Sequence, residues 1–237
     1  MKHTIFKVDT LLMIKNHNPF YTSPLLITAA MEKEIAPLMR KFKGKIHKPQ
    51  KNNNLFIAEN NGEKLYFLIT GVGKRAVKFK LKKTLELIKI NSIISIGMAG
   101  AVSEELFIGD NVMSMNVLWE NHKGKRTINC KGVERKFESI ELDIFECPGA
   151  KKVNDNLTVP TVFYSEDKCS LSNDVGIVDM ETYFIAKIAK KMYPECKVFS
   201  IRSVSDERNS KLPTLGNFTN NLFLNLLIAM GTFHKKT

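Results

Sequence analysis

The chain alternates short, wholly apolar runs with longer segments in which apolar residues recur every three or four positions. Leu25–Ala30 reads LLITAA and Ile93–Ile96 reads IISI, and both runs are continuous. Such runs are typical of strands that are buried on both faces of a sheet. Glu32 to about Lys43 and Lys74–Ile90 instead place their apolar side chains on one side of a helix. The pattern therefore predicts strands alternating with amphipathic helices.

The same alternation continues to the end of the chain. Asn61-Gly62 lies between two apolar runs and predicts a hairpin, whereas Glu120–Glu138 is polar and is expected to be irregular. Together these elements predict an α/β fold with a mixed, twisted central sheet covered by helices on both sides. Further strands are expected at Leu55–Ala58, Lys64–Thr70, Asn111–Trp119, Ser139–Phe145, Thr158–Tyr164, Val175–Val178 and Lys197–Ser203, and helices at Glu181–Met192 and Leu222–Phe233.

Length and composition add limits to this picture. The 237 residues suffice for one large domain, and we expect residues 24–237 to form it. Residues 1–23 are polar, end before Pro24 and are interpreted as an N-terminal extension rather than a secretory signal. No apolar run reaches the roughly 20 residues of a membrane helix, so we expect no membrane span.

The net charge is +12, from 36 Lys and Arg against 24 Asp and Glu. A basic balance can indicate a nucleic-acid partner, but the lysines are scattered and no nucleic-acid-binding motif accompanies them. We interpret them as a solvated surface. The cysteines form no CxxC pair and match no metal-site spacing, which predicts free thiols in a reducing, cytoplasmic compartment. These cysteines are Cys130, Cys147, Cys169 and Cys196.

Residues able to do chemistry follow the predicted strands. Glu32 and Glu34 follow the first strand, and each is equally explained as a helix-capping acid. Gly71–Lys74 and Gly97–Gly100 provide glycines that let a backbone approach a ligand, or that only make a tight turn. Asp206 ends the last strand and suits either a helix cap or a proton donor. Open α/β sheets bind ligands at this edge.

Taken together, these segments resemble the nucleoside phosphorylase/nucleosidase family, and most closely the 5′-methylthioadenosine/S-adenosylhomocysteine nucleosidases. The resemblance implies a three-layer αβα sandwich, a homodimer or larger homo-oligomer, and a small-molecule nucleoside as ligand, with no metal or organic cofactor. The matching segments are ITAAMEKEIAPL (Ile27–Leu38), ITGVGKRAV (Ile69–Val77), IISIGMAGAV (Ile93–Val102), IGD (Ile108–Asp110), VDMETYFIAKIA (Val178–Ala189) and FSIRSVSD (Phe199–Asp206).

The resemblance also implies roles for single residues. Asp206 matches the acid that protonates the purine at N7, and Glu34 the carboxylate that orients the attacking water. Glu181 matches the acid that holds the ribose hydroxyls. These roles fit the chemistry, because N-glycosidic cleavage passes through an oxocarbenium-like sugar and needs a protonated leaving base. The remaining substrate-binding candidates are Met180 under the sugar, Met98, Ala99 and Gly100 beside the nucleophile site, and Ser205 flanking the acid.

Three functions stay open from the sequence. Hydrolysis of a purine nucleoside, with a 5′-substituted one favoured, is the first. Phosphorolysis of a purine nucleoside or of a hopanoid-linked adenosine is the second, because Glu120–Arg126 and Leu212-Pro213 resemble the hopanoid-associated branch; phosphate would then be a substrate, and the basic surface could meet an anionic membrane. The third is a scaffold that binds without catalysis. The segment between Ser165 and Glu181 is short, and Phe163 or Tyr164 would have to replace the aromatic residue that stacks on the base.

Overall fold

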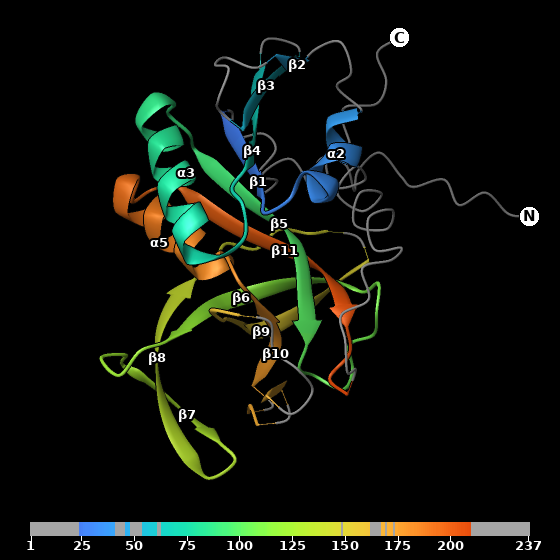
Figure 1. Ribbon diagram of the computed structural model, residues 1–237, viewed down its shortest axis with the longest axis vertical. Helices are drawn as coiled ribbons and strands as arrows, with labels where there is room; N and C mark the ends of the chain where they lie inside the picture. Colours follow the sequence, from blue (N-terminus) through green and yellow to red (C-terminus); the bar gives the residue numbers. More distant parts are fainter. Residues whose placement is uncertain are drawn as a thin grey trace, which may run out of the picture.

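The computed structural model describes residues 24–40, 46–47, 54–60, 63–147, 149–161, 167–168, 170–172 and 174–209. They form one 11-stranded sheet, whose strands run in the order β2-β3-β4-β1-β5-β10-β9-β6-β8-β7, with β11 pairing with β5 and β6 (Figure 1). The strands are β1 (Leu25–Ala29), β2 (Ile46–His47), β3 (Leu55–Asn60), β4 (Glu63–Ile69), β5 (Ser92–Ala101), β6 (Asn111–Glu120), β7 (Arg126–Cys130), β8 (Val133–Glu141), β9 (Ala150–Thr158), β10 (Val175–Asp179) and β11 (Lys197–Asp206).

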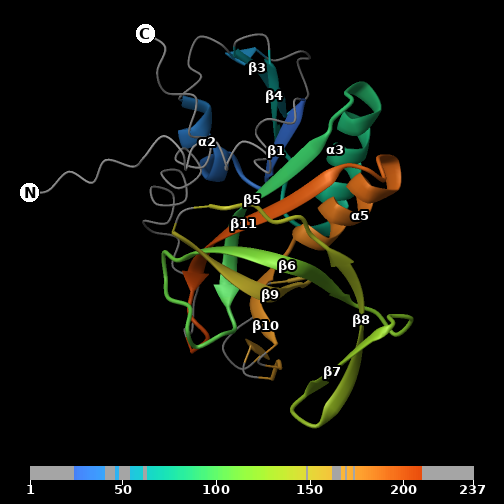
Figure 2. The ribbon, with the colours of Figure 1, turned by 180° about the vertical axis from the view of Figure 1, so that it is seen from behind.

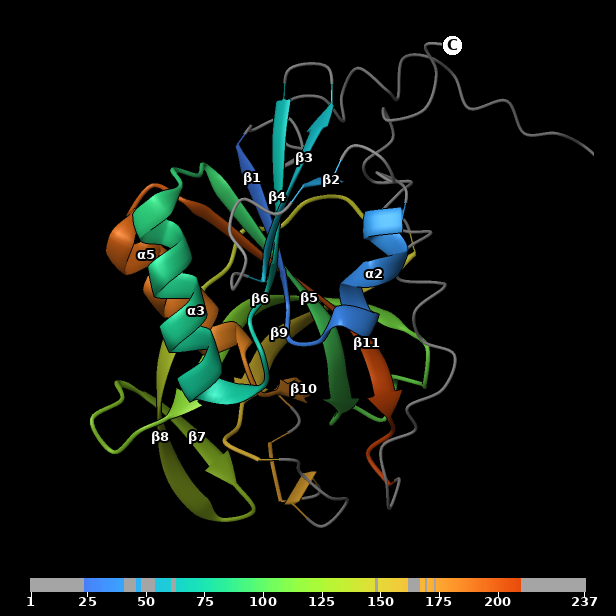
Figure 3. The same ribbon diagram turned by 45° about the horizontal axis from the view of Figure 1, so that its top comes forward.

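Three helices cover the sheet from its two sides. The helix α2 (Glu32–Arg40) lies on one face, and α3 (Gly73–Leu87) and α5 (Thr182–Met192) pack together on the other, as Figure 3 shows. Helices on both faces of a sheet give the three-layer αβα arrangement expected from the sequence. The α/β fold class is therefore confirmed.

The strand β1 shows why its residues form the centre of the sheet. All five of its residues are buried, and consecutive side chains of a strand point to opposite faces. Ile27 packs into the core under α2, whereas Leu26 packs into the core under α3 and α5. Burying one such side chain stabilises the fold by about 1.5 to 3 kcal/mol, so both helical layers hold the same strand in place.

The sheet is mixed, as predicted. The strand β1 runs parallel to β4 and β5, and β11 runs parallel to β5 along nearly its whole length. The strand β10 instead pairs antiparallel with β5, and β11 pairs antiparallel with β6. The C-terminal ends of β1, β10 and β11 and the C-terminal part of β5 consequently approach one another near the centre of the molecule (Figure 2).

Two sequence-based predictions were wrong. The segment Glu120–Glu138, expected to be irregular, forms β7 and most of β8, a hairpin that projects from the body in Figure 1. The inward-facing Ile128, Cys130 and Phe137 belong to a small core beneath this hairpin. In the sequence these apolar residues are separated by polar and charged ones, which conceals the strand pattern. The strand expected at Thr158–Tyr164 instead spans Ala150–Thr158, because β9 pairs with β6 through its backbone despite its polar side chains.

Several further predictions fall outside the described residues: the N-terminal extension, the Asn61-Gly62 turn, Cys169, and the helix Leu222–Phe233. The other three cysteines are buried, and burial raises the pKa of the Cys147 and Cys196 thiols to about 11. Such thiols are poor nucleophiles at neutral pH. Within the part of the chain that the structure describes, no helix has the length and apolar character needed to cross a membrane.

Candidate active site

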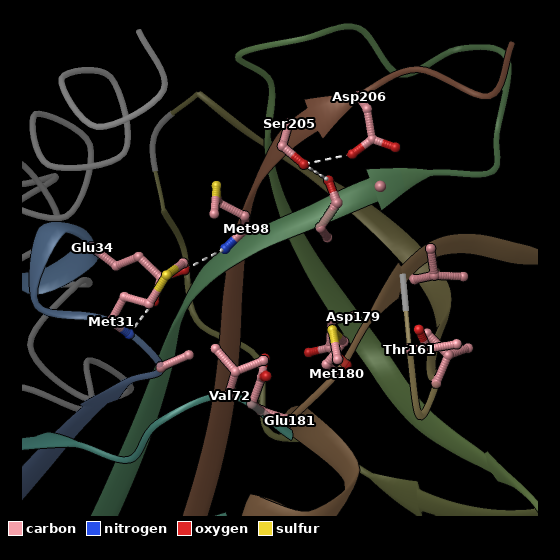
Figure 4. A pocket seen from close by; sticks show the side chains of 15 residues that line it. Met31, Glu34, Val72, Met98, Thr161, Asp179, Met180, Glu181, Ser205 and Asp206 are labelled. Atoms are coloured by element: carbon pink, nitrogen blue, oxygen red, sulfur yellow. Dashed lines mark hydrogen bonds between the residues drawn. The ribbon is translucent and has the colours of Figure 1, made fainter. Parts of the chain in front are cut away.

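A cavity of about 380 Å³ lies where these strand ends meet. Figure 4 shows Glu34 at one side of it, Ser205 and Asp206 at another, and Glu181 at a third. The structure places all eight site residues predicted from the sequence around this one cavity, although they come from four separate segments of the chain. These residues are Glu34, Met98, Ala99, Gly100, Met180, Glu181, Ser205 and Asp206.

Glu34 is held from two directions. Its Oε2 accepts a hydrogen bond from the backbone N–H of Met31 at 2.8 Å, and its Oε1 accepts one from the N–H of Met98 at 3.3 Å. The first contact is the helix-capping interaction, and the second ties the same carboxylate to β5. Glu34 is 3% exposed, and burial raises its pKa, while Arg202 and these N–H groups oppose that rise. Glu34 therefore both caps α2 and faces the cavity.

Arg202 organises the floor of this region. Its guanidinium is 2% exposed, and its Nε donates to Asp179 Oδ2 at 2.9 Å. Its Nη2 donates to Ser95 Oγ at 2.8 Å and to Thr182 Oγ1 at 2.7 Å. Its Nη1 has no hydrogen-bond partner among the described residues. A buried guanidinium nitrogen without a partner is costly, and so it marks a place where a ligand oxygen would be stabilised.

Gly97 brings that nitrogen and Glu34 together. A Cβ at Gly97 would lie 3.1 Å from Arg202 Nη1 and 3.1 Å from Glu34 Oε1, so the absent side chain leaves room for both groups. Gly97 and Gly100 lie inside β5 and not at a strand–helix turn, which corrects the sequence-based interpretation of this glycine pair. Their function in the fold is close approach of side chains to the strand backbone.

Glu181 lies at the start of α5. Its Oε1 accepts a hydrogen bond from the N–H of Gly73, the first residue of α3, at 2.9 Å. Burial and the neighbouring Asp179 carboxylate raise the pKa of Glu181 to about 7. Asp179 itself accepts hydrogen bonds from Thr158 Oγ1 at 2.7 Å and from the Thr182 hydroxyl. Glu181 is thus the carboxyl group of this region that changes charge near neutral pH.

Asp206 lies at the other end of the cavity. Its Oδ1 accepts a hydrogen bond from Ser205 Oγ at 2.6 Å, and its Oδ2 accepts one from Lys168 Nζ. Lys168 Nζ also donates to the backbone carbonyl of Glu207 at 3.0 Å. Lys168 is fully buried, and the Asp206 side chain is 7% exposed. A buried ion pair therefore closes this end of the cavity.

The walls between the two ends are mostly apolar. Among the described residues, no aromatic side chain lines the cavity, and Phe163 and Tyr164, expected as substitutes for the stacking residue, lie outside the described residues. A cavity with mostly apolar walls and charged groups at its ends suits a ligand with an apolar body and polar edges. The remaining lining residues are Ala30, Met31, Val72, Val159, Thr161, Val178 and Asp179.

From the sequence alone, no role was assigned to Arg202 or to Lys168. For Arg202 there was a signal: it is the single charged residue in the run FSIRSVS, and a charge in a buried strand requires partners. For Lys168 there was none, because it lies in a polar stretch between Asp167 and Cys169. Its contact with Asp206 depends entirely on tertiary structure.

Solved structures with a similar fold include 5′-methylthioadenosine/S-adenosylhomocysteine nucleosidases. That of Campylobacter jejuni has a TM-score of 0.68 at 19% identity, over 88% of this chain and 96% of its own. That of Streptococcus pneumoniae, in complex with 8-aminoadenine, has 0.65 at 21%, over 87% and 92%. A Helicobacter pylori variant with 5′-methylthioadenosine in its active site has 0.67 at 16%, over 87% and 98%.

At the level of sequence alone, no curated protein matches the chain. A family model does match: that of the phosphorylase superfamily, over residues 24–145. This match covers half of the chain and includes β1, α2, α3, β5 and β6, which carry Glu34 and the glycines of the cavity. The chain belongs to the phosphorylase superfamily.

Proposed function

We propose that this protein hydrolyses the N-glycosidic bond of a purine nucleoside, and that its preferred substrate is substituted at the 5′ position, as in 5′-methylthioadenosine or S-adenosylhomocysteine. The observation that carries the proposal is the placement of three carboxylates around one cavity, with Glu34 and Asp206 at two sides of it and Glu181 at a third. The fold neighbours, which include complexes with 5′-methylthioadenosine and with 8-aminoadenine, support a nucleoside of this kind.

Glu34 supports water as the nucleophile. Its carboxylate lines the cavity, and a water in the cavity can donate a hydrogen bond to it. Burial raises the pKa of Glu34, which makes the group a better proton acceptor than an ordinary carboxylate. Attack of that water on C1′ would transfer its proton to Glu34.

Asp206 supports departure of the base. A purine leaves poorly as an anion, and a proton at N7 converts it into a neutral leaving group. Asp206 lies at the opposite end of the cavity from Glu34, with Ser205 orienting one of its oxygens. Acid and base functions on opposite sides of the scissile bond are the arrangement that glycoside hydrolysis requires.

Glu181 and Met180 fit the sugar between these two ends. The Glu181 carboxylate can accept hydrogen bonds from ribose hydroxyls and stabilise positive charge developing on the ring. Met180 lines the cavity beside it and offers an apolar surface to the ribose. A Glu181 pKa of about 7 means that sugar binding through an ionised Glu181 should strengthen as pH rises through 7.

Phosphorolysis is the second candidate, with phosphate as nucleophile and a soluble or hopanoid-linked nucleoside as substrate. The unpartnered Nη1 of Arg202 favours it, because a guanidinium binds phosphate well. The Glu34 carboxylate, however, accepts hydrogen bonds at the same place, and a carboxylate there repels a phosphate dianion. Hydrolysis is therefore the function that the geometry supports best.

The test is release of adenine from 5′-methylthioadenosine, with and without phosphate, by the wild-type protein and by Asp206→Asn. We expect release without phosphate and a loss of about 10³-fold in kcat in the variant. Asp174→Asn, which changes an exposed acid outside the cavity, is the matched control and should keep full activity. Release only with phosphate would instead establish phosphorolysis. No release from any purine nucleoside would leave the scaffold interpretation.

A further inference from the structure

Lys168 is a fully buried cation whose ammonium group is held by Asp206. Its Nζ donates to Asp206 Oδ2 and, at 3.0 Å, to the Glu207 carbonyl. A Cβ at Gly100 would lie 2.8 Å from Asp206 Oδ2 and 3.0 Å from Lys168 Nζ. The ion pair thus lies directly against β5, and a side chain at position 100 would collide with both of its members.

The two members of the pair differ in their relation to the cavity. Asp206 lines it, whereas Lys168 lies behind Asp206 and does not. The charged residues beside the pair in the sequence are Asp167, which precedes Lys168, and Glu207 and Arg208, which follow Asp206. Glu207 accepts a hydrogen bond from the N–H of Ile108, and Arg208 donates to the Val102 carbonyl. No second described carboxylate forms an ion pair with Lys168.

An ionised carboxylate that is paired with an ammonium holds no proton of its own. In this ion pair Lys168 Nζ carries the protons and donates a hydrogen bond to Asp206 Oδ2. Lys168 therefore holds a proton one hydrogen bond away from a carboxylate that lines the cavity.

We propose that Lys168 is the proton source of this site and that it acts through Asp206, which passes the proton to the leaving base. The inference rests on the proposed function, since it concerns the same bond cleavage. Lys168 is in this respect a positioning and proton-supplying residue, while Asp206 is the group that contacts the base.

The step balances as follows in protons and electrons. The C1′–N9 bond breaks and its electron pair goes to the purine. A proton moves from Lys168 Nζ to the Asp206 carboxylate, and the carboxyl group so formed passes that proton to purine N7, which leaves Asp206 as a carboxylate again and Lys168 as a neutral amine. The water oxygen bonds to C1′ and its proton goes to Glu34. Glu34 then releases a proton to solvent, and Lys168 takes one up, which restores both groups.

The decisive variant is Lys168→Arg. Arginine keeps the positive charge and can donate hydrogen bonds to Asp206, but it does not give up a proton in proteins. Lys168→Met removes both the charge and the proton. Lys151→Met is the matched control, since Lys151 forms an exposed ion pair with Asp110 at 2.7 Å outside the cavity.

Two substrates separate proton supply from a structural role. Adenine departure from 5′-methylthioadenosine needs a proton, whereas para-nitrophenol departs from para-nitrophenyl riboside as a stable phenolate. At about pH 7.5, we expect both Lys168 variants to lose about 10²-fold in kcat on the nucleoside and less than about 3-fold on the riboside.

Each outcome is decisive. Full nucleoside cleavage by Lys168→Arg would show that only the charge matters and would overturn the proposal. Equal losses on both substrates, or variants that do not fold, would give Lys168 a structural role and would overturn it too. If the wild-type protein cleaves no purine nucleoside, the proposed function itself fails, and that result is recognised before any variant is made.

Discussion

The two ends of the cavity both contain carboxylates and a buried cation, but they differ in net charge. At the end that contains Glu34, three carboxylates, those of Glu34, Asp179 and Glu181, surround one guanidinium, that of Arg202. At the other end, one carboxylate faces one ammonium, Lys168. Negative charge is in excess at the first end and balanced at the second.

This difference explains where protons are held. Where carboxylates outnumber cations, burial and mutual repulsion favour protonation, and the pKa of Glu181 rises to about 7. Where charges balance, the Asp206 carboxylate is paired with the Lys168 ammonium, which donates a hydrogen bond to it. A site with two such ends can accept a proton from water at one and supply a proton to a base at the other.

The largest effect is expected from removing the cation at the carboxylate-rich end. Arg202→Met leaves Asp179 buried without a positive partner, which should lower the free energy of unfolding by about 3 to 5 kcal/mol. Arg135→Met is the matched control, because Arg135 pairs with Glu120 at 3.6 Å on the surface and should cost at most about 1 kcal/mol. Urea unfolding measures both, and equal small losses would contradict the description of Arg202 as the organiser of this end.

A second prediction concerns proton acceptance by Glu34. Glu34→Gln keeps the shape of the side chain but cannot take a proton from water, so kcat for adenine release should fall by about 10²-fold with KM changed only a few-fold. Glu32→Gln changes the exposed acid in the same helical turn and should leave kcat unchanged. A loss that appears only in KM, or in both variants, would reduce Glu34 to a helix cap.

The smallest effect is the pH dependence of stability caused by Glu181. Its pKa rises from 4.5 in the unfolded chain to about 7, so the folded protein binds the proton more tightly. Stability from this group is fully present below about pH 4.5 and is lost as pH rises toward 7. Glu181→Gln should therefore make the fall in unfolding free energy between about pH 5 and pH 8 smaller by about 2 to 3 kcal/mol.

Urea titrations of both proteins at the two pH values measure this difference. Glu195→Gln serves as the control, since Glu195 is exposed on the turn after α5 and should not alter the slope. If the unfolding free energies of wild-type and Glu181→Gln fall by the same amount between these two pH values, ionisation of Glu181 does not cause the pH dependence.

Much of the site could be predicted because its residues follow strands that the sequence marks clearly. Leu25–Ala29 and Val175–Asp179 are buried on both faces. Their apolar runs therefore predict two strands, and Glu34 and Glu181 follow shortly after the ends of these strands. The β7–β8 hairpin could not be predicted in this way, because the contacts that stabilise it come from β6 and from its own small core. The hydrophobic pattern predicts a strand well where both faces of the strand are buried, and poorly where one face is exposed.

By itself, the sequence predicted the α/β class, a mixed central sheet and the eight candidate residues that line the cavity, because hydrophobic periodicity and strand-end chemistry are local properties. Only the tertiary structure decided how those residues are charged. The contact of Arg202 with Asp179, and that of Lys168 with Asp206, join segments that are 23 and 38 residues apart. Protonation depends on burial and on neighbouring charges, and both are produced by the packing of distant segments.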